Sequence, residues 1–218
     1  AAEGAALLGR VFDIEPDHAP ALVTLGDALA VKGEHESAVA AFRRALASRP
    51  DDAGLHNKLG VALGELSRFQ EAEAAYRCAL ALDGHLTRAC FNLGVALAEQ
   101  GRLAEAEDAY RAALAREPAH GGAWLNLGNI LADQKRHGEA ANAYRRAIEA
   151  DPNNPGLLCN LAGALYRQGL LDDAIVQYRR AIALEPDYLR ALRLLGLVLH
   201  EAGQLREAAE IYRRVLAL

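Results

Sequence analysis

The chain has 218 residues, of which 52% are hydrophobic, and its 24 basic and 29 acidic side chains give a net charge of −5. This balance lacks the basic face or stripe of a nucleic-acid-binding protein. No apolar run approaches the roughly 18 residues of a membrane helix. We therefore expect neither nucleic acid nor a membrane as a partner.

The first residues match only part of a larger pattern. Residues 1–18 resemble the second half of a repeat, and the sequence contains no methionine. We therefore expect the native chain to begin upstream of Ala1. The opening residues also lack the charged and apolar regions of a signal peptide.

A Leu-Gly pair then returns every 34 residues, which is typical of a repeat array. Five full repeats and a shorter sixth follow, within one predicted domain spanning residues 1–218. The copies of the pair are Leu25-Gly26, Leu59-Gly60, Leu93-Gly94, Leu127-Gly128, Leu161-Ala162 and Leu195-Gly196. The predicted repeats are 19–52, 53–86, 87–120, 121–154, 155–188 and 189–218.

Several positions, numbered from the first residue of each repeat, keep one kind of side chain. Positions 7 and 11 are always Leu, position 20 is always Ala, and position 24 is always an aromatic ring. Residues three or four apart share one face of a helix, so this spacing predicts two amphipathic helices in each repeat. A Gly, Ser or Lys at position 15 marks the turn between them. The sequence therefore predicts an all-α chain.

The pattern around Trp124, Leu127, Gly128, Ala140 and Tyr144 resembles the tetratricopeptide repeat. The resemblance covers the whole chain, with departures such as Gly84 in place of Pro. It implies a right-handed superhelical solenoid of antiparallel helix pairs. It also implies a concave groove, formed by the first helices, that binds a protein or peptide partner.

Position 6 of the first helix is expected to face that groove. It carries an asparagine in three successive repeats, Asn92, Asn126 and Asn160, preceded by Lys58. An amide side chain both donates and accepts hydrogen bonds, so a ladder of them could hold the backbone of an extended peptide. The ladder resembles that of O-linked N-acetylglucosamine transferases, although asparagine is also common at this position in the family.

Other groove positions are expected to form pockets for side chains of the ligand. Phe91, Leu125, Val95 and Asn129 lie beside the ladder. Position 13 supplies an acidic rim that favours a basic peptide or is simply a solvated face. The rim residues are Glu65, Glu99 and Asp133, followed by Arg167 and Glu201.

A competing interpretation of the groove is the carboxylate clamp of chaperone adaptors in this family, which recognises a C-terminal carboxylate. Asn129, Asn160 and Arg190 would suit it. The resemblance requires basic residues where Leu125 and Leu194 stand, so we reject the clamp.

Residues with catalytic or metal-binding potential form no recognisable set. The seven histidines lack metal-ligand spacing, and we expect them to be exposed polar residues. Cys78, Cys90 and Cys159 are odd in number and widely spaced, which indicates free thiols and a cytoplasmic protein. We expect Cys90 to be buried and Cys159 to be accessible. No cofactor and no enzymatic activity are predicted.

Three functions remain open at this point. The first is a protein-interaction scaffold that binds an extended peptide. The second is the substrate-recruiting arm of a larger enzyme, such as a glycosyltransferase. The third is self-association, because the last helix, residues 206–218, keeps its apolar pattern without a polar capping helix after it.

Overall fold

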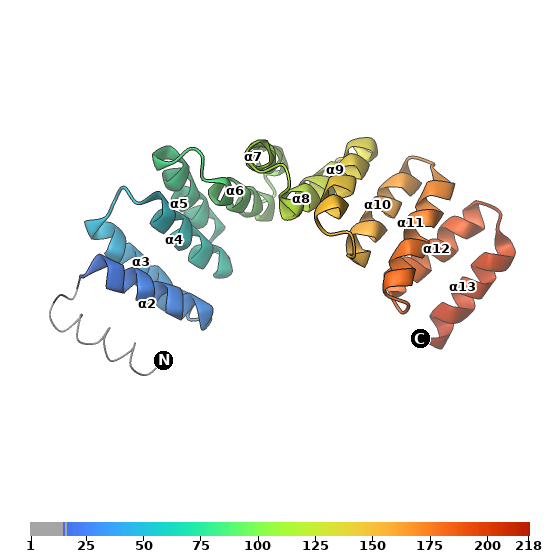
Figure 1. Ribbon diagram of the computed structural model, residues 1–218, viewed down its shortest axis with the longest axis horizontal. Coiled ribbons are helices and arrows are strands. Elements are labelled where there is room, and N and C mark those ends of the chain that lie inside the picture. Colours follow the sequence, from blue (N-terminus) through green and yellow to red (C-terminus); the bar gives the residue numbers. More distant parts are fainter. Residues whose placement is uncertain (1–14, 16) are drawn as a thin grey trace. The chain divides into compact units, whose positions relative to one another are not determined.

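The computed structural model describes residue 15 and residues 17–218, which form twelve α-helices and no strands (Figure 1). The predicted all-α repeat array is confirmed for these residues. The half repeat predicted at residues 1–18 falls almost entirely outside them. The predicted handedness of the superhelix stays a prediction.

The helices divide between two compact units, one ending at Arg116 and one running from Glu117 to Leu218. Each unit holds three helix pairs (Figure 1). The first unit contains α2 (Ala19–Val31), α3 (His35–Ser48), α4 (Ala53–Glu65), α5 (Phe69–Leu82), α6 (Thr87–Glu99) and α7 (Leu103–Arg116). The second contains α8 (Gly121–Asp133), α9 (His137–Ala150), α10 (Pro155–Arg167), α11 (Leu171–Leu184), α12 (Leu189–Glu201) and α13 (Leu205–Ala217).

The turn inside each helix pair has the same backbone conformation in every repeat. Position 15 has a positive φ, from 57° at Ser67 to 80° at Gly33. Glycine takes this left-handed conformation without a steric penalty, whereas Ser67 and Lys135 do not. Backbone bonds around the turn, such as Glu34 N–H to Leu29 C=O at 2.9 Å, satisfy groups that the helix end leaves free.

The close approach of the paired helices depends on the glycine of the Leu-Gly pair. A Cβ placed on Gly128 would lie 2.6 Å from the ring of Tyr144, and one on Gly60 would lie 2.5 Å from that of Tyr76. Both distances are far below van der Waals contact. The small residue at position 8 and the ring at position 24 therefore fit each other within a pair.

Leucines and alanines fill the core within each unit. Leu63, Leu97, Leu131, Leu165 and Leu199 at position 11 are all buried. Successive first helices touch one another, α4 with α6 in the first unit and α10 with α12 in the second. The first helices are thus the elements that can share a surface within a unit.

Ion pairs recur between successive second helices. The arginine at position 25 contacts the glutamate at position 19 of the next repeat, as in Arg43–Glu71 at 2.7 Å and Arg179–Glu207 at 2.6 Å. These side chains are about half exposed, so each pair adds little to stability. The arginine that each repeat carries at position 25 therefore joins neighbouring repeats at these two places.

Candidate functional site

The first unit contains a cavity of about 370 Å³ against its first helices. Its wall is apolar around Phe91 and Val95, and the Phe91 ring lies 5.8 Å from that of Tyr110. Two glutamates, Glu65 and Glu99, supply the charge at this cavity. The remaining lining residues are Val61, Gly64, Phe69, Tyr76, Asn92 and Ala96.

The second unit contains a larger cavity of about 610 Å³, lined by residues of α8 to α12. Its wall is more polar than that of the first cavity. Arg167 and Arg190 bring positive charge, and Asp133 brings negative charge. The other lining residues are Asn129, Ala132, His137, Tyr144, Cys159, Asn160, Gly163, Ala164, Tyr166, Tyr178, Leu194 and Leu197.

The two cavities occupy the same register of the repeat. Every residue lining the first cavity has its counterpart, two repeats later, in the lining of the second. The tyrosine at position 24 and the asparagine at position 6 are unchanged. Several other positions differ in chemistry: Phe91 is replaced by Cys159, Val95 by Gly163 and Glu99 by Arg167. One framework thus presents two chemically different hollows.

The eight groove residues expected from the sequence do not all reach these cavities. Phe91, Asn92 and Val95 line the first cavity, and Asn129 and Asn160 line the second. Lys58 instead forms an ion pair with Asp27 at 2.5 Å. Leu125 and Asn126 are half-buried on α8 and line neither cavity.

The asparagine ladder is divided between the units. Asn92 lies in the first unit, where its amide donates to Asn57 Oδ1 at 3.1 Å. Asn126 and Asn160 lie in the second. The link from Asn92 to Asn57 does not follow the 34-residue spacing, so alignment of equivalent positions did not show it.

The solvent exposure of two cysteines and of the histidines differs in part from what the sequence predicted. Cys90 is buried, as expected, but Cys159 is also buried, at 1% exposure, so its expected accessibility is wrong. Burial raises the pKa of the Cys159 thiol. Of the seven histidines, His85 and His200 are exposed as expected, and the expectation is wrong for the other five, which are half-buried. His120, one of the five, caps α8 by accepting from Ala123 N–H at 3.1 Å.

Two tyrosine hydroxyls at the second cavity have different surroundings. Tyr144 donates to Asn129 Oδ1 at 2.9 Å. The Tyr178 hydroxyl is buried and has no hydrogen-bond partner among the described residues. Burial raises the pKa of Tyr144 to about 12 and that of Tyr178 further, so both stay protonated donors at neutral pH. Tyr178 was not expected from the sequence, although Gly163, the only glycine at position 9 of the six repeats, is a signal that points to it.

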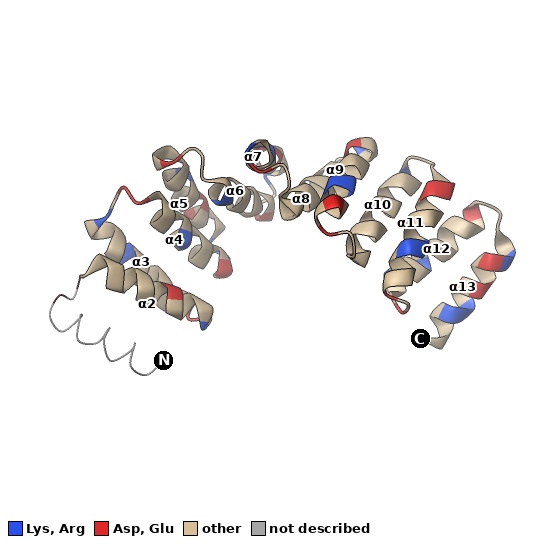
Figure 2. Ribbon diagram, in the orientation of Figure 1, with Lys and Arg blue, Asp and Glu red and all other residues tan. Residues whose placement is uncertain are grey.

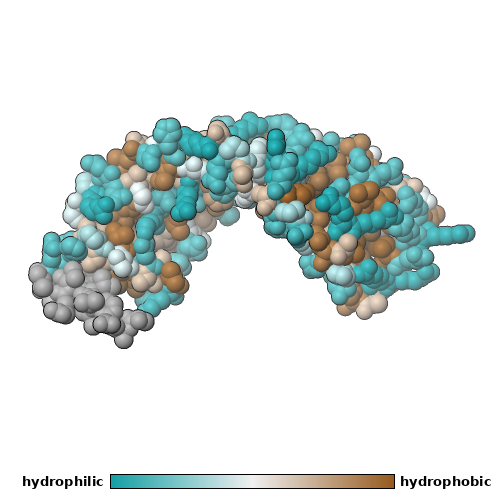
Figure 3. Space-filling model, viewed as in Figure 1, coloured by the Kyte–Doolittle hydropathy of each residue, from teal (hydrophilic) through white to brown (hydrophobic). Residues whose placement is uncertain are grey.

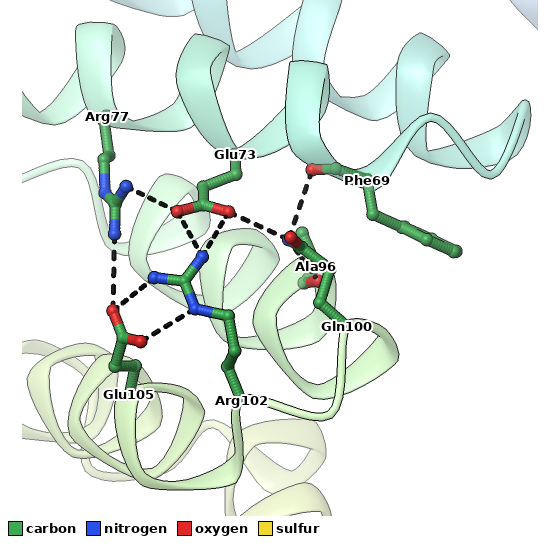
Figure 4. A network of polar contacts seen from close by, with 7 residues as sticks. All are labelled: Phe69, Glu73, Arg77, Ala96, Gln100, Arg102 and Glu105. Atoms are coloured by element: carbon green, nitrogen blue, oxygen red, sulfur yellow. Dashed lines mark hydrogen bonds and ion pairs between the residues drawn. The ribbon is translucent and has the colours of Figure 1, made fainter.

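A connected group of charged side chains lies elsewhere, between α5, α6 and α7 (Figure 4). Buried Glu73 accepts from Arg102 at 2.7 Å and from Gln100 at 2.9 Å, and it also contacts Arg77. Arg102 also donates to Glu105 at 2.7 Å. Each charge in this network has a partner within it, so the network joins two repeats and offers no open site.

No group of three or more His, Cys, Asp or Glu side chains in the part of the chain that the structure describes is placed to hold a metal ion. None of the described helices combines the length and the apolar character that a membrane crossing needs.

Family models of the tetratricopeptide repeat match the sequence in overlapping segments that together run from residue 26 to residue 218. The matched segments are 57–112 and 91–155 for one model, 26–67 and 164–203 for a second, 143–176 for a third and 191–218 for a fourth. The chain is a tetratricopeptide repeat protein. No curated protein matches the sequence.

Solved structures similar to this tetratricopeptide repeat chain agree with the fold. MamA has a TM-score of 0.72 at 23% identity, over 77% of this chain and 92% of MamA. YrrB, described as a TPR protein with an unusual peptide-binding site, has a TM-score of 0.72 at 19% identity, over 85% of this chain and 95% of YrrB. PilF of Pseudomonas aeruginosa has a TM-score of 0.73 at 27% identity, over 89% of this chain and 88% of PilF.

Proposed function

We propose that this tetratricopeptide repeat protein is a non-enzymatic interaction scaffold whose first helices bind an extended peptide of a protein partner. The observation that carries the proposal is the pair of cavities in the same register of the two units. Each cavity lies against first helices of neighbouring repeats, so each suits a side chain of an extended peptide, which presents its side chains at regular intervals.

The chemistry of the cavity walls supports a peptide ligand. Each wall combines an aromatic or aliphatic surface with a few polar groups, which is typical of sites that fix the orientation of a ligand. Asn92 and Asn160 provide amides at equivalent points. The peptide-binding site named for YrrB is consistent with this use of the fold.

The finer expectations are part of this proposal. Asn92, Asn126, Asn160, Phe91, Leu125, Asn129, Val95 and Lys58 are the proposed contact residues. The asparagine ladder still resembles that of O-linked N-acetylglucosamine transferases, and a recruiting arm of a larger enzyme would use the same groove. The predicted single array over residues 1–218, with its repeat boundaries, also stays a prediction.

Self-association is a second candidate, and one observation favours it. Large apolar side chains are exposed on the last helix, among them Leu205 at 58% and Leu216 at 87%. Figure 2 shows charged residues of both signs on the same helix, and Figure 3 shows apolar areas beside polar ones on the surface. Mass measured by light scattering over a range of concentrations tests it; a constant monomer mass would contradict it.

Selection from a displayed library of random dodecapeptides tests the peptide-binding proposal. We expect the chain to enrich related sequences, and the triple variant Asn92→Ala/Asn126→Ala/Asn160→Ala to bind the resynthesised peptides at least about tenfold more weakly, because several contacts of about 0.5–1.5 kcal/mol act together. Asn142→Ala on the second helix α9 is the matched control. Failure to enrich any peptide contradicts the proposal.

A further inference from the structure

The Tyr178 hydroxyl is an unusual feature of the second cavity. The side chain is fully buried, yet its hydroxyl has no hydrogen-bond partner among the described residues. Buried polar groups are nearly always hydrogen-bonded, and leaving one without a partner is unfavourable. This donor lines the cavity, so a ligand there could supply the missing acceptor.

Gly163 explains why the protein itself does not supply that acceptor. In the preceding repeat, Asn129 occupies the same position and accepts from the hydroxyl of Tyr144. Gly163 has no side chain, and a Cβ built there would lie 3.7 Å from the Tyr178 hydroxyl oxygen. In the first cavity the equivalent residue is Val95. The missing side chain therefore leaves the Tyr178 hydroxyl without the acceptor that Tyr144 has.

Two arginines at the same cavity lack acidic partners. Neither Arg167 nor Arg190 forms an ion pair in the described part of the chain; Arg167 stacks at 5.7 Å over the ring of Tyr166. Burial raises the pKa of Tyr144, Tyr178 and Cys159, and the positive charge of nearby Arg190 acts in the opposite direction on each. Many other arginines of the chain are paired with glutamates.

The acidic groups nearby do not cancel this charge. Asp133 lines the cavity and raises the pKa of Tyr144 after burial. Glu201 accepts the hydroxyl of Tyr166 at 2.6 Å. His137 also has a partnerless Nδ1 at the cavity, but His35 at the same repeat position has one too, so this feature follows from the repeat. The lining therefore carries two positive charges and one negative.

We infer that the second cavity binds the carboxylate of a glutamate or aspartate side chain of a bound peptide, held by Arg167, Arg190 and the Tyr178 hydroxyl. This inference rests on the proposed function. A carboxylate is acceptor-only and can take bonds from two arginines and a hydroxyl at once. Asn160 adds an amide donor at the same cavity. The first cavity, with Glu65 and Glu99, would reject the same side chain.

The test compares the composition of dodecapeptides selected by the chain and by three variants. The charge variant is Arg167→Gln/Arg190→Gln, the hydroxyl variant is Tyr178→Phe, and the blocking variant is Gly163→Val, which restores the residue type of the first cavity. Arg180→Gln, exposed on α11 and bonded to Gln177, is the matched control. Circular dichroism and melting curves confirm that each variant folds.

We expect acidic residues to be enriched at one position of the peptides selected by the chain and by the control. For a resynthesised peptide, Glu→Gln at that position and the charge variant should each weaken binding about tenfold or more, and Tyr178→Phe about threefold to tenfold. Gly163→Val should abolish the acidic preference. Selected peptides without an acidic position, or a preference that all three variants retain, overturn the inference while peptide binding stands.

Two further results separate the possible failures. If affinity falls when the peptide C-terminus is amidated but not when its acidic side chain is changed, the cavity holds a terminal carboxylate and the side-chain inference is wrong. If no peptide is selected by any protein, the proposed function itself fails, and the inference fails with it.

Discussion

The two cavities share a framework and differ at the residues that a ligand would touch. In both, the ring at position 24 packs beside a Leu-Gly helix, and an asparagine occupies position 6. The first is smaller, with Phe91 and Val95; the second is larger and has Cys159, Gly163 and Arg167 at positions where the first has Phe91, Val95 and Glu99. The repeat therefore fixes where a hollow forms, and a few variable positions determine what it can hold.

The units also differ in the interior of their second helices. At position 21 the first unit has buried Val39 and two buried glutamates, Glu73 and Glu107. The second unit has buried Ala141 and Ile175 at the same position. An apolar contact needs no partner, whereas each buried carboxylate depends on arginines that surround it. Neutralising these carboxylates or their arginine partners should therefore lower the stability of the first unit and leave that of the second unchanged.

The largest expected effect tests whether the framework is shared. Leu63→Ala and Leu131→Ala remove equivalent buried leucines from the two units. Each should lower the free energy of unfolding by about 2–5 kcal/mol, because a buried cavity replaces the lost methyl groups. Chemical denaturation combined with hydrogen exchange resolved by unit measures both losses. A loss at only one site would show that the two frameworks are not equivalent.

The next effect tests the charged interior of the first unit. Glu73→Ala removes the carboxylate that accepts from Arg102 and Gln100, and it should cost about 1–3 kcal/mol. Glu105→Ala, in the same network but about half exposed, is the matched control and should cost less than about 1 kcal/mol. Thermal melts of the three proteins measure the difference. Equal losses would mean that burial of Glu73 is unimportant.

The pH dependence of stability provides a related test. Burial raises the pKa of Glu73, but hydrogen bonds from Gln100 and Arg102 and the charges of Arg77 and Arg102 outweigh it and leave the pKa below its ordinary value of 4.5. The carboxylate therefore stabilises the fold fully above pH 4.5, and this contribution disappears as the pH falls through the lowered pKa. The melting temperature of Glu73→Gln should lie below that of the unchanged chain at pH 7, and the gap should close in acid. A difference in melting temperature that stays the same from pH 7 into acid would contradict the stabilising role of the Glu73 carboxylate.

The smallest expected effect compares two tyrosines of the second unit. Tyr144→Phe loses the hydrogen bond to Asn129 and should cost about 0.5–1.5 kcal/mol. Tyr178→Phe removes a hydroxyl with no partner in the described structure and should leave stability unchanged or slightly higher. Urea denaturation of both variants measures the difference. A larger loss for Tyr178→Phe would show that its hydroxyl is satisfied in solution.

The fold was predictable from the sequence because its determinants recur at fixed positions. The leucines at position 11, the turn at position 15 and the fit of Gly128 against Tyr144 all follow from local spacing and side-chain size. The site was predictable only in part. Tyr178 and Tyr144 occupy the same position in their repeats. Only the Tyr144 hydroxyl has a hydrogen-bond partner among the described residues, because the first helix of its pair carries Asn129 where the first helix beside Tyr178 carries Gly163.

Cys159 illustrates the same limit. Its position on a first helix predicted access to the groove, but neighbouring side chains cover it. Similarly, Lys58 forms an ion pair with Asp27 of the preceding repeat, and Asn92 donates to Asn57 of the preceding repeat. Such contacts depend on how far side chains extend from one helix to the next. A comparison of equivalent repeat positions gives no information about this distance.

The single tryptophan, Trp124, lies in the second unit, where its indole N–H donates to the carbonyl of Pro118 at 2.7 Å. Indole emission is therefore a natural optical reporter of one half of the molecule. Loss of structure around α8 would alter the emission of Trp124, whereas the first unit contributes no indole signal of its own. Comparing fluorescence with far-ultraviolet dichroism, which sees every helix, would show whether the two halves unfold together without any added label.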